Sequence, residues 1–312
     1  MDSVDSGNTA QAPQTPTGTP TGAAAKAPTK TRDDENFPVA SRLIPAALRP
    51  HVHAFYLCVR AADDVADAAD LAPEVKSAQL TAMDEALQGM RSGDALTIAA
   101  SNHRQSALET GVTIDHARHL LQAFVMDITK KRYRNWSELI NYCLYSAAPV
   151  GRYLVDLHGE DDTPKKRTDA LCIALQILNH LQDCKDDYLE LDRVYIPEDM
   201  LRANGTTVEA LNASRASPEL RATFNALLDR TDELILQARG GPALIRNRGL
   251  RLETAVIVAI AERLSRKLRR LDPVATRVEL STLEKMLSVV TGLWRGTRQG
   301  MGQGMGHGLR QR

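Results

Sequence analysis

Two pairs of acidic residues share a spacing that suits metal chemistry. Arg60–Asp67 reads R-A-A-D-D-V-A-D and holds Asp63 and Asp67 four positions apart, and Asp183 and Asp187 repeat that spacing. Residues four apart lie on one face of a helix, so each pair can direct two carboxylates toward one ion. Oxygen donors without a His or Cys cluster favour Mg²⁺ over Zn²⁺. Because Mg²⁺ keeps positions open for phosphate oxygens, the spacing predicts a substrate that carries a phosphate or diphosphate.

The second acidic pair belongs to a polar stripe on a helix that is otherwise apolar. Gln176, Asn179, Asp183 and Asp187 recur at i, i+3, i+7 and i+11, so they share one helical face. Burying such groups is costly unless a partner meets them, and a metal ion is one such partner. One acidic cluster is most often a solvated helix face. Two identically spaced pairs, one of them on a helix that looks buried, instead favour a functional site.

The rest of the chain predicts the helices that must position these residues. Apolar side chains recur at intervals of three and four from Pro50 to Ala69, and Gly and Pro residues separate the later helical stretches. The pattern contains neither strands alternating with helices nor a repeat of fixed period, so we expect an all-α fold of roughly ten helices. The other main expected helices span 73–90, 94–108, 115–132, 136–158, 165–190, 217–239, 249–271 and 278–295.

The two ends differ in composition from the middle. Residues 1–33 are rich in Thr, Pro, Gly and Ala and too poor in large apolar side chains to fold, which predicts a disordered leader. Glycines alternate with other residues through 297–312, and we interpret this segment as a flexible tail rather than a dinucleotide-binding loop. Residues 34–296 are then the expected catalytic domain.

Composition excludes several classes of protein. The formal net charge is zero, which argues against a general nucleic-acid binder. The four cysteines are scattered without a CxxC pair, as in cytosolic proteins with reduced thiols. The longest apolar run, 255–261, falls far short of the about 20 residues that span a bilayer, and the first thirty residues lack a secretory signal. We therefore expect a cytoplasmic protein.

Four motifs together resemble the head-to-head prenyl synthases, the squalene and phytoene synthase family, along essentially the whole ordered length. They are R-x-x-D-D-x-x-D at Arg60–Asp67, Y-S-A-A-P-V-G at Tyr145–Gly151, Q-x-x-N-x-x-x-D-x-x-x-D at Gln176–Asp187 and R-V-Y-I-P at Arg193–Pro197. The resemblance implies a single-domain isoprenoid-synthase-type helical bundle with a central apolar cavity. Among the branches of the family, the chain looks most like the hydroxysqualene synthases of bacterial hopanoid biosynthesis. The features that suggest this branch are Glu35–Ser41, Pro149 and N-x-x-Q-D at Asn179–Asp183.

The resemblance also implies roles for individual residues. Asp63, Asp64 and Asp67 match the first aspartate-rich motif, and Asp183 and Asp187 match the second, so these five would hold Mg²⁺ against the substrate diphosphate. Asp63, Asp67, Asp183 and Asp187 are the expected catalytic residues. The expected substrate-binding residues are Asn36, Arg60, Gln176, Asn179, Arg193 and Arg277. An ion pair from Arg60 to a neighbouring aspartate on the same helix is an alternative role that can coexist with substrate binding.

Two positions depart from the family pattern, and both bear on the condensation of two farnesyl diphosphates. Gln182 stands where relatives commonly carry Arg, and Ile260 where they often carry Tyr. The branch resemblance implies instead that presqualene diphosphate reacts with water to give hydroxysqualene and diphosphate. Candidates to position that water are Tyr145, His180 and Gln182. Apolar residues expected to shield the cation are Val59, Leu144, Ala147 and Leu178.

Two alternatives remain open on the sequence. One is presqualene diphosphate, squalene or phytoene synthase activity on the same fold. The other is a non-catalytic helical scaffold, although a scaffold has no use for two converging sets of carboxylates. The expected partners are an isoprenoid diphosphate substrate and other hopanoid-pathway enzymes, with no nucleic acid. The basic late helices could also make peripheral contact with the inner face of the membrane.

Overall fold

The computed structural model describes residues 43–91 and 93–308. Asn36, the leader at 1–33 and the last four residues of the tail lie outside the described residues. The described chain is all-α, as predicted: its only β pairing is an isolated parallel bridge between Arg132 and Val194. No helix in these described ranges is long and apolar enough to cross a bilayer.

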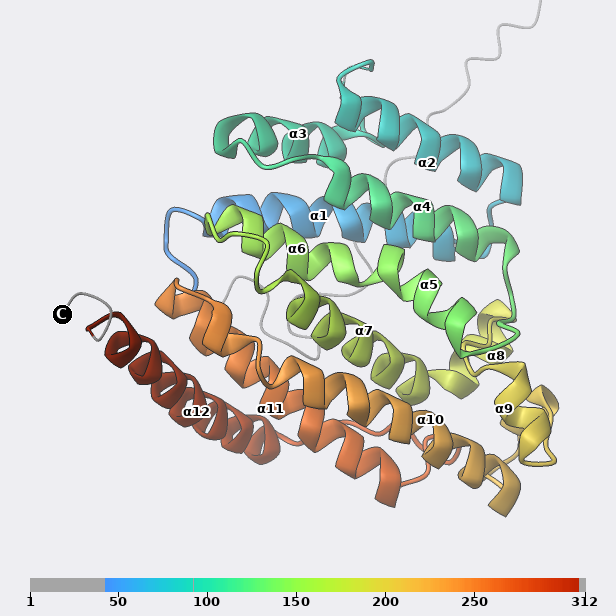
Figure 1. The fold of residues 1–312 in the computed structure, drawn as a ribbon. Helices are drawn as coiled ribbons and strands as arrows, with labels where there is room; N and C mark the ends of the chain where they lie inside the picture. The colour runs from blue at the N-terminus through green and yellow to red at the C-terminus, as the bar shows by residue number, and fades with distance from the viewer. Residues whose placement is uncertain (1–42, 92, 309–312) are drawn as a thin grey trace, which may run out of the picture.

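The first helices form one layer of the molecule (Figure 1). Helix α1 (Arg49–Asp67) packs against α3 (Ile98–Thr110) and α4 (Asp115–Thr129), and α2 (Pro73–Gln88) contacts all three. At the centre of this core the Phe55 ring stacks on Tyr153 with 4.0 Å between ring centroids. The packing fixes α1, and with it the first acidic motif at the C-terminal end of that helix.

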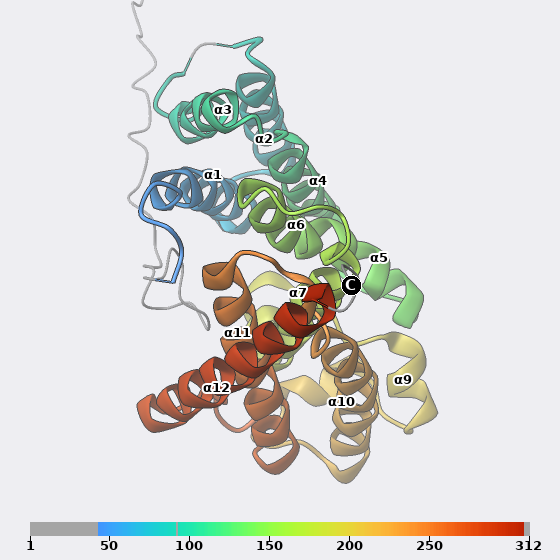
Figure 2. The same cartoon turned by 60° about the vertical axis from the view of Figure 1, so that its left-hand side comes forward.

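The later helices form a second layer, built around α7 (Lys165–Gln182). Helix α10 (Pro218–Ala238) and α11 (Arg248–Arg270) both pack against α7, and α12 (Thr282–Gly308) packs along α11 on the outer side (Figure 2). Leu178 and Ile177 of α7 are almost fully buried in this core. The apolar face of α7 therefore anchors the helix, and its polar stripe faces the first layer.

Two expected helices are broken in the structure. The stretch expected at 136–158 forms α5 (Trp136–Ser146) and α6 (Ala148–Leu157), with Ala147 at φ −133° and ψ −48° between them. Pro149 explains the break, because proline lacks an N–H and clashes with the preceding turn. The stretch expected at 165–190 bends at Asp183, which ends α7 and precedes α8 (Cys184–Leu191).

Other element boundaries also differ from the sequence prediction. Three short elements were not expected, namely α9 (Glu198–Ala203) and the 3₁₀ helices η2 (Val208–Asn212) and η3 (Pro242–Leu244). The last helix was expected to end at 295, but α12 continues to Gly308, so residues 297–308 extend a helix. The close approach of α12 to α11 explains why Gly292 and Gly296 occur inside this helix.

Candidate active site

A polar cavity of about 220 Å³ lies between the two helical layers. Both acidic motifs face it, one from α1 and the other from the junction of α7 and α8. Its volume is below the about 300–1,000 Å³ typical of pockets for whole drug-sized ligands, so it suits the charged end of a substrate. The lining residues are Arg60, Asp63, Asp67, Phe124, Asp127, Tyr142, Ser146, Gln176, Asn179, His180, Asp183, Asp187, Leu191, Arg193, Tyr195 and Arg277.

In the first acidic motif, carboxylates pair with an arginine on the same helix. Arg60 donates to Asp63 and to Asp64 at 2.6 Å each, as the ion-pair alternative predicted. Asp63 and Asp67 line the cavity, whereas Asp64 does not. Arg60 also lines the cavity, so its ion pairs are compatible with the expected role in binding the substrate.

Arg193 links the first acidic motif to the segment that follows α8. Its guanidinium donates to the Asp67 carboxylate at 2.6 Å and to the backbone carbonyls of Ala66 and Asp127 at 3.2 Å each. Burial acts to lower the pKa of Arg193, but nearby Tyr195, Asp67 and Asp127 outweigh it and leave the pKa raised. A permanent positive charge therefore lies buried beside the cavity.

The second acidic motif receives its positive charge from the loop before α12. Arg277 donates to the two carboxylate oxygens of Asp183 at 2.5 and 3.3 Å. Gln182, one of the two positions expected to depart from the family pattern, does not line the cavity and donates from Nε2 to the backbone carbonyl of Val278. Gln182 thus anchors the backbone next to Arg277, and Arg277 pairs with both Asp183 and Glu279.

The site also contains a buried carboxylate that the sequence did not indicate. Asp127 on α4 accepts hydrogen bonds from the Tyr142 hydroxyl at 2.7 Å and the Tyr195 hydroxyl at 3.1 Å. Burial raises the pKa of Asp127 to about 6, although Arg193 and the two tyrosines act to lower it. The sequence offered one indication of this residue, because Asp127 lies between Met126 and Ile128 on an amphipathic helix. A single acidic residue in such a helix is usually interpreted as solvent-exposed.

We expect Asp127→Asn to change the pH dependence of stability. The unfolded-state pKa of Asp is about 3.9. The folded protein therefore holds a proton between about pH 4 and 6 that the unfolded chain releases, and the stability from that proton is lost as pH rises through 6. The free energy of unfolding of Asp127→Asn relative to wild type should rise by about 3 kcal/mol from pH 4 to 7. Urea unfolding of both proteins measures this difference, and parallel pH profiles would contradict the assignment.

His180 is the one water-positioning candidate of the three that lines the cavity. Its ring stacks on Tyr195 with 3.5 Å between centroids, and its Nε2 lies 3.2 Å from Nε2 of Gln176. Burial lowers the pKa of His180 to about 3, with Arg193 adding to the effect, so the imidazole is neutral. Tyr145 instead packs edge-on against His119 outside the cavity.

The residues expected to shield a carbocation do not line this cavity. Leu178 and Ala147 are buried, and Val59 and Leu144 pack against the two apolar cores. The other departure from the family pattern, Ile260 on α11, is likewise a core residue and does not reach the cavity. The expected central apolar cavity therefore differs from the cavity described here, whose lining is largely charged.

The carboxylates of the site suit Mg²⁺ better than a metal ion whose ligands all come from the protein. Among the described residues, no three His, Cys, Asp or Glu side chains converge closely enough to hold an ion by themselves. The cavity is instead lined by five carboxylates and three guanidiniums, a formal charge of −2 with Asp127 ionised. Mg²⁺ commonly binds one or two protein carboxylates and completes its shell with water and substrate phosphates. Two separated Asp pairs match that chemistry.

Solved structures share this helical arrangement. The squalene synthase of Alicyclobacillus acidocaldarius is similar with a TM-score of 0.63 and 29% identity, over 74% of this chain and 87% of that one. A dehydrosqualene synthase solved with a ligand gives a TM-score of 0.69 over 83% of this chain and 91% of that one. At 19% identity, this second similarity concerns the fold alone.

The chain belongs to the squalene/phytoene synthase family, which matches residues 30–284. It is 44% identical to the hydroxysqualene synthase of Rhodopseudomonas palustris over 83% of this chain and 88% of the relative. The hydroxysqualene synthase of Sinorhizobium fredii is 43% identical over 81% and 86%, and that of Zymomonas mobilis is 40% identical over 85% and 89%. The family predicted from the motifs is thus confirmed, and with it an enzyme of the kind that processes prenyl diphosphates.

Proposed function

We propose that the protein is a magnesium-dependent hydroxysqualene synthase, which converts presqualene diphosphate and water to hydroxysqualene and diphosphate. Identity of 40–44% to three hydroxysqualene synthases, over more than four fifths of the chain, carries this proposal. The cavity supports it, since both aspartate-rich motifs and three arginines face one polar space. The non-catalytic scaffold does not explain that convergence.

The charged side chains would act on the departing diphosphate. Asp63 and Asp67 on one side, with Asp183 and Asp187 on the other, would hold Mg²⁺. When bound, the ion neutralises negative charge that develops on the leaving group. The guanidiniums that now pair with these aspartates would also contact diphosphate oxygens, and such preorganised charges usually contribute the largest share of catalysis.

We assign the positioning of the attacking water to His180. The carbon–oxygen bond to diphosphate breaks and its electron pair leaves with the diphosphate. A water oxygen then bonds to the resulting carbocation, and the proton that it loses passes to the departed diphosphate. Because the Gln176 amide donates to Nε2 of His180, the neutral imidazole carries its proton on Nδ1 and would hold the water by donating to its oxygen, without adding a second positive charge beside the cation. Its contacts with Tyr195 and Gln176 hold the ring in place.

Product analysis with both candidate substrates tests the function. The purified protein is incubated with presqualene diphosphate or with farnesyl diphosphate, each with Mg²⁺ and with or without NADPH. We expect hydroxysqualene from presqualene diphosphate without NADPH. If no alcohol forms while two farnesyl diphosphates are condensed efficiently, the protein is instead a condensing synthase of the family.

The proposed reaction also indicates where the substrate comes from. Presqualene diphosphate has to be made by a condensing enzyme, and we propose that this enzyme, from the same hopanoid pathway, is the partner of the present chain in the cytoplasm. Magnesium-dependent thermal stabilisation by a non-hydrolysable diphosphate analogue would support the substrate class independently of turnover. An unchanged melting temperature would favour the scaffold.

A further inference from the structure

Helix α12 carries a row of large apolar side chains that no other part of the described structure covers. Leu283, Met286, Leu287, Val290 and Trp294 recur at i, i+3, i+4, i+7 and i+11, and their exposed fractions are 45–66%. This spacing places all five on one face of the helix. We call these five residues the α12 stripe. Single exposed apolar residues are ordinary, but a continuous row marks an interaction surface.

The opposite face of α12 is built from small residues that allow close packing on α11. Ser288 is fully buried, and Gly292 and Gly296 follow at intervals of four. A Cβ at Gly292 would lie 2.3 Å from the Cα of Val256, so the two helix backbones are nearly in contact there. At about 100° per residue, the α12 stripe lies roughly opposite Gly292 on the helix. The helix thus docks through its small side and presents its apolar side outward.

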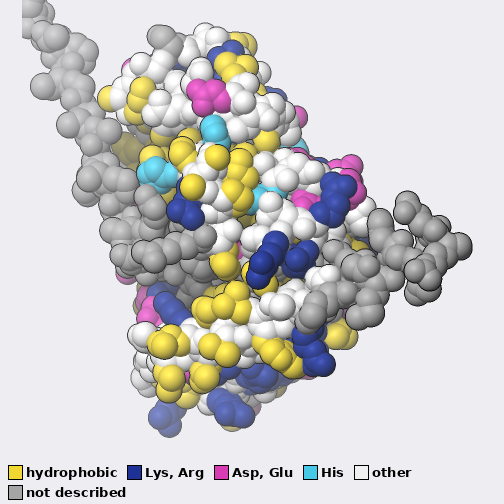
Figure 3. All heavy atoms as spheres, turned by 90° about the vertical axis from the view of Figure 1, so that its left-hand side faces the viewer, with side chains coloured by type: hydrophobic (Ala, Val, Ile, Leu, Met, Phe, Trp, Pro, Cys, Tyr) yellow, Lys and Arg dark blue, Asp and Glu magenta, His cyan; other side chains and the backbone are white. Residues whose placement is uncertain are grey.

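The surroundings of the α12 stripe are strongly basic. Helix α11 contains seven Lys or Arg against two Glu, and α12 up to Gly300 contains three against one. Some of these cations are paired with acids, since Glu262 binds Arg295, Glu284 binds Lys267 at 2.5 Å and Arg269 binds Asp229 and Asp232 of α10. The remaining Lys and Arg of the two helices still outnumber the remaining acidic residue, Glu253, which is buried. Figure 3 shows hydrophobic side chains beside Lys and Arg, with few Asp or Glu, across the lower part of this face. An apolar surface surrounded by cations is complementary to a surface that is apolar inside and negatively charged at its boundary.

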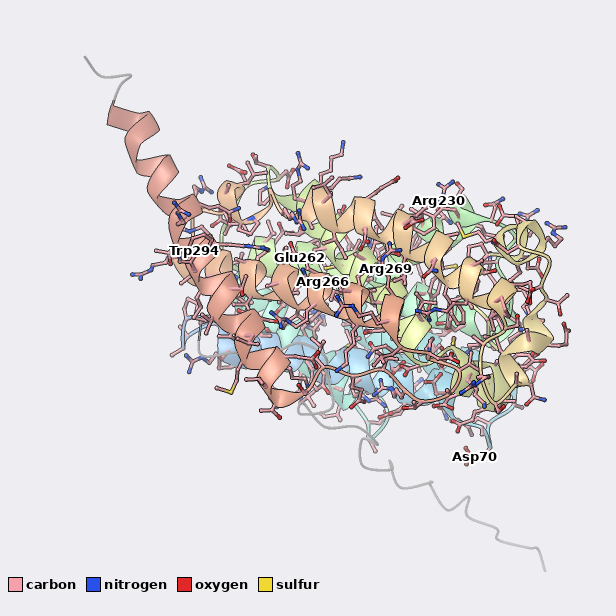
Figure 4. The ribbon with its side chains drawn as sticks, turned by 90° about the horizontal axis from the view of Figure 1, so that it is seen from below. Asp70, Arg230, Glu262, Arg266, Arg269 and Trp294 are labelled. Carbon is pink, nitrogen blue, oxygen red and sulfur yellow. The ribbon has the colours of Figure 1, made fainter. Side chains whose placement is uncertain are left out.

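We propose that the α12 stripe is a docking surface for an anionic lipid bilayer, on which the helix lies parallel to the membrane. Amphipathic helices with a basic polar side and Trp or Leu on the apolar side bind in this way. Trp294 lies on α12 at the edge of the molecule (Figure 4), with the Arg298 guanidinium 4.6 Å from its ring centroid. That pair combines an aromatic ring suited to the headgroup region with a cation for lipid phosphates.

The same charges argue against a second copy of the chain as the occupant. Two stripes facing each other would bring two basic surfaces together, and like charges at an interface cost several kcal/mol. A bilayer with anionic lipids instead gains about 1 kcal/mol for each Lys or Arg near its surface. None of the five residues of the α12 stripe lines the active-site cavity, so this surface is separate from the site of the proposed reaction.

Vesicle flotation of the full-length protein tests the proposal. Wild type should float with phosphatidylcholine vesicles that contain phosphatidylglycerol, and less with phosphatidylcholine alone or in high salt. The double substitution Leu287→Glu with Val290→Glu should lower the floated fraction by about tenfold, since it places two charges where apolar groups enter the lipid. Leu236→Glu on α10 is the matched control, because Leu236 is equally exposed outside the stripe, at 63%.

Three outcomes would overturn the proposal. Equal flotation of wild type and the double variant would show that the α12 stripe is not the contact. Binding insensitive to anionic lipid would remove the role of the basic surroundings. If wild type does not float but sediments as a dimer, and the double variant sediments as a monomer, the stripe is instead a surface for self-association. Val290→Ser serves as a milder second variant if the double variant fails to fold, and turnover in detergent should be unchanged in either.

Discussion

Asp183→Asn should lower kcat for presqualene diphosphate by about 10²–10³-fold, the usual effect of removing one preorganised charge at a reacting centre. Asp183 faces the cavity and binds Arg277, so the neutral amide loses a proposed metal ligand and one of the two carboxylates that pair with this arginine, the other being Glu279. Steady-state kinetics with saturating Mg²⁺ measure the effect. The folded state should be retained, because the side chain is partly exposed.

Asp186→Asn provides a matched control on the same turn. Asp186 has the same charge, lies three positions away and is exposed outside the cavity. We expect its kcat to stay within about twofold of wild type, as for a surface substitution away from any special feature. If Asp183→Asn and Asp186→Asn lower kcat equally, the total negative charge of this segment supports turnover, rather than the position of Asp183 in the cavity.

Arg193→Met should destabilise the protein and abolish most of its activity. Arg193 is 6% exposed and binds Asp67 and the carbonyls of Ala66 and Asp127, so methionine removes the donor to Asp67 and to the Asp127 carbonyl, whereas the Ala66 carbonyl still accepts from Lys76. Breaking a buried ion pair costs about 3–5 kcal/mol. Because Asp67 is 41% exposed and partly solvated, we expect about 2–4 kcal/mol here. Urea unfolding at pH 7 measures the loss.

Arg91→Met is the control for Arg193→Met. Arg91 pairs with Asp94 at 3.0 Å, but both side chains are exposed, and such surface pairs contribute about 0–1 kcal/mol. Arg193→Lys keeps the charge but cannot make the same forked contacts, so it should recover only part of the stability. A loss of less than about 1 kcal/mol in Arg193→Met would show that this arginine does not organise the site.

The acidic motifs were predictable because their chemistry is local in sequence. The i, i+4 spacing of Asp63 and Asp67 needs only one turn of helix, and the structure places both on the cavity. The stripe from Gln176 to Asp187 also reaches the cavity, even though the helix bends at Asp183. No residue type near Asp183 signals that bend, whereas Pro149 could have indicated the break between α5 and α6.

The residues that the sequence missed depend on contacts between distant segments. Asp127 becomes part of the site only because Tyr142, Tyr195 and Arg193 arrive from other parts of the chain. On its own helix its acidic side chain looks solvated. Arg277 was expected near the diphosphate from resemblance alone, and its contact with Asp183 spans 94 positions. Tertiary pairing of this kind leaves no periodic signal.

Two interpretations changed once the packing was known. Gln182 was expected to remove a positive charge beside the second acidic pair, but it anchors the loop from which Arg277 supplies that charge. The last helix was expected to end at 295 and residues 297–312 to form a low-complexity tail, whereas α12 continues to Gly308. Within α12, Gly292 and Gly296 let the helix approach α11, because a residue without Cβ leaves room for the α11 backbone.

In the proposed reaction, diphosphate leaves by carbon–oxygen cleavage and water captures the cation. Turnover of presqualene diphosphate in H₂¹⁸O, with Mg²⁺ and without NADPH, tests it most directly by mass spectrometry of both products. We predict that hydroxysqualene carries one ¹⁸O in its hydroxyl group and that the released diphosphate carries none. Unlabelled alcohol with ¹⁸O in the phosphate product would show hydrolysis at phosphorus and contradict the proposed mechanism.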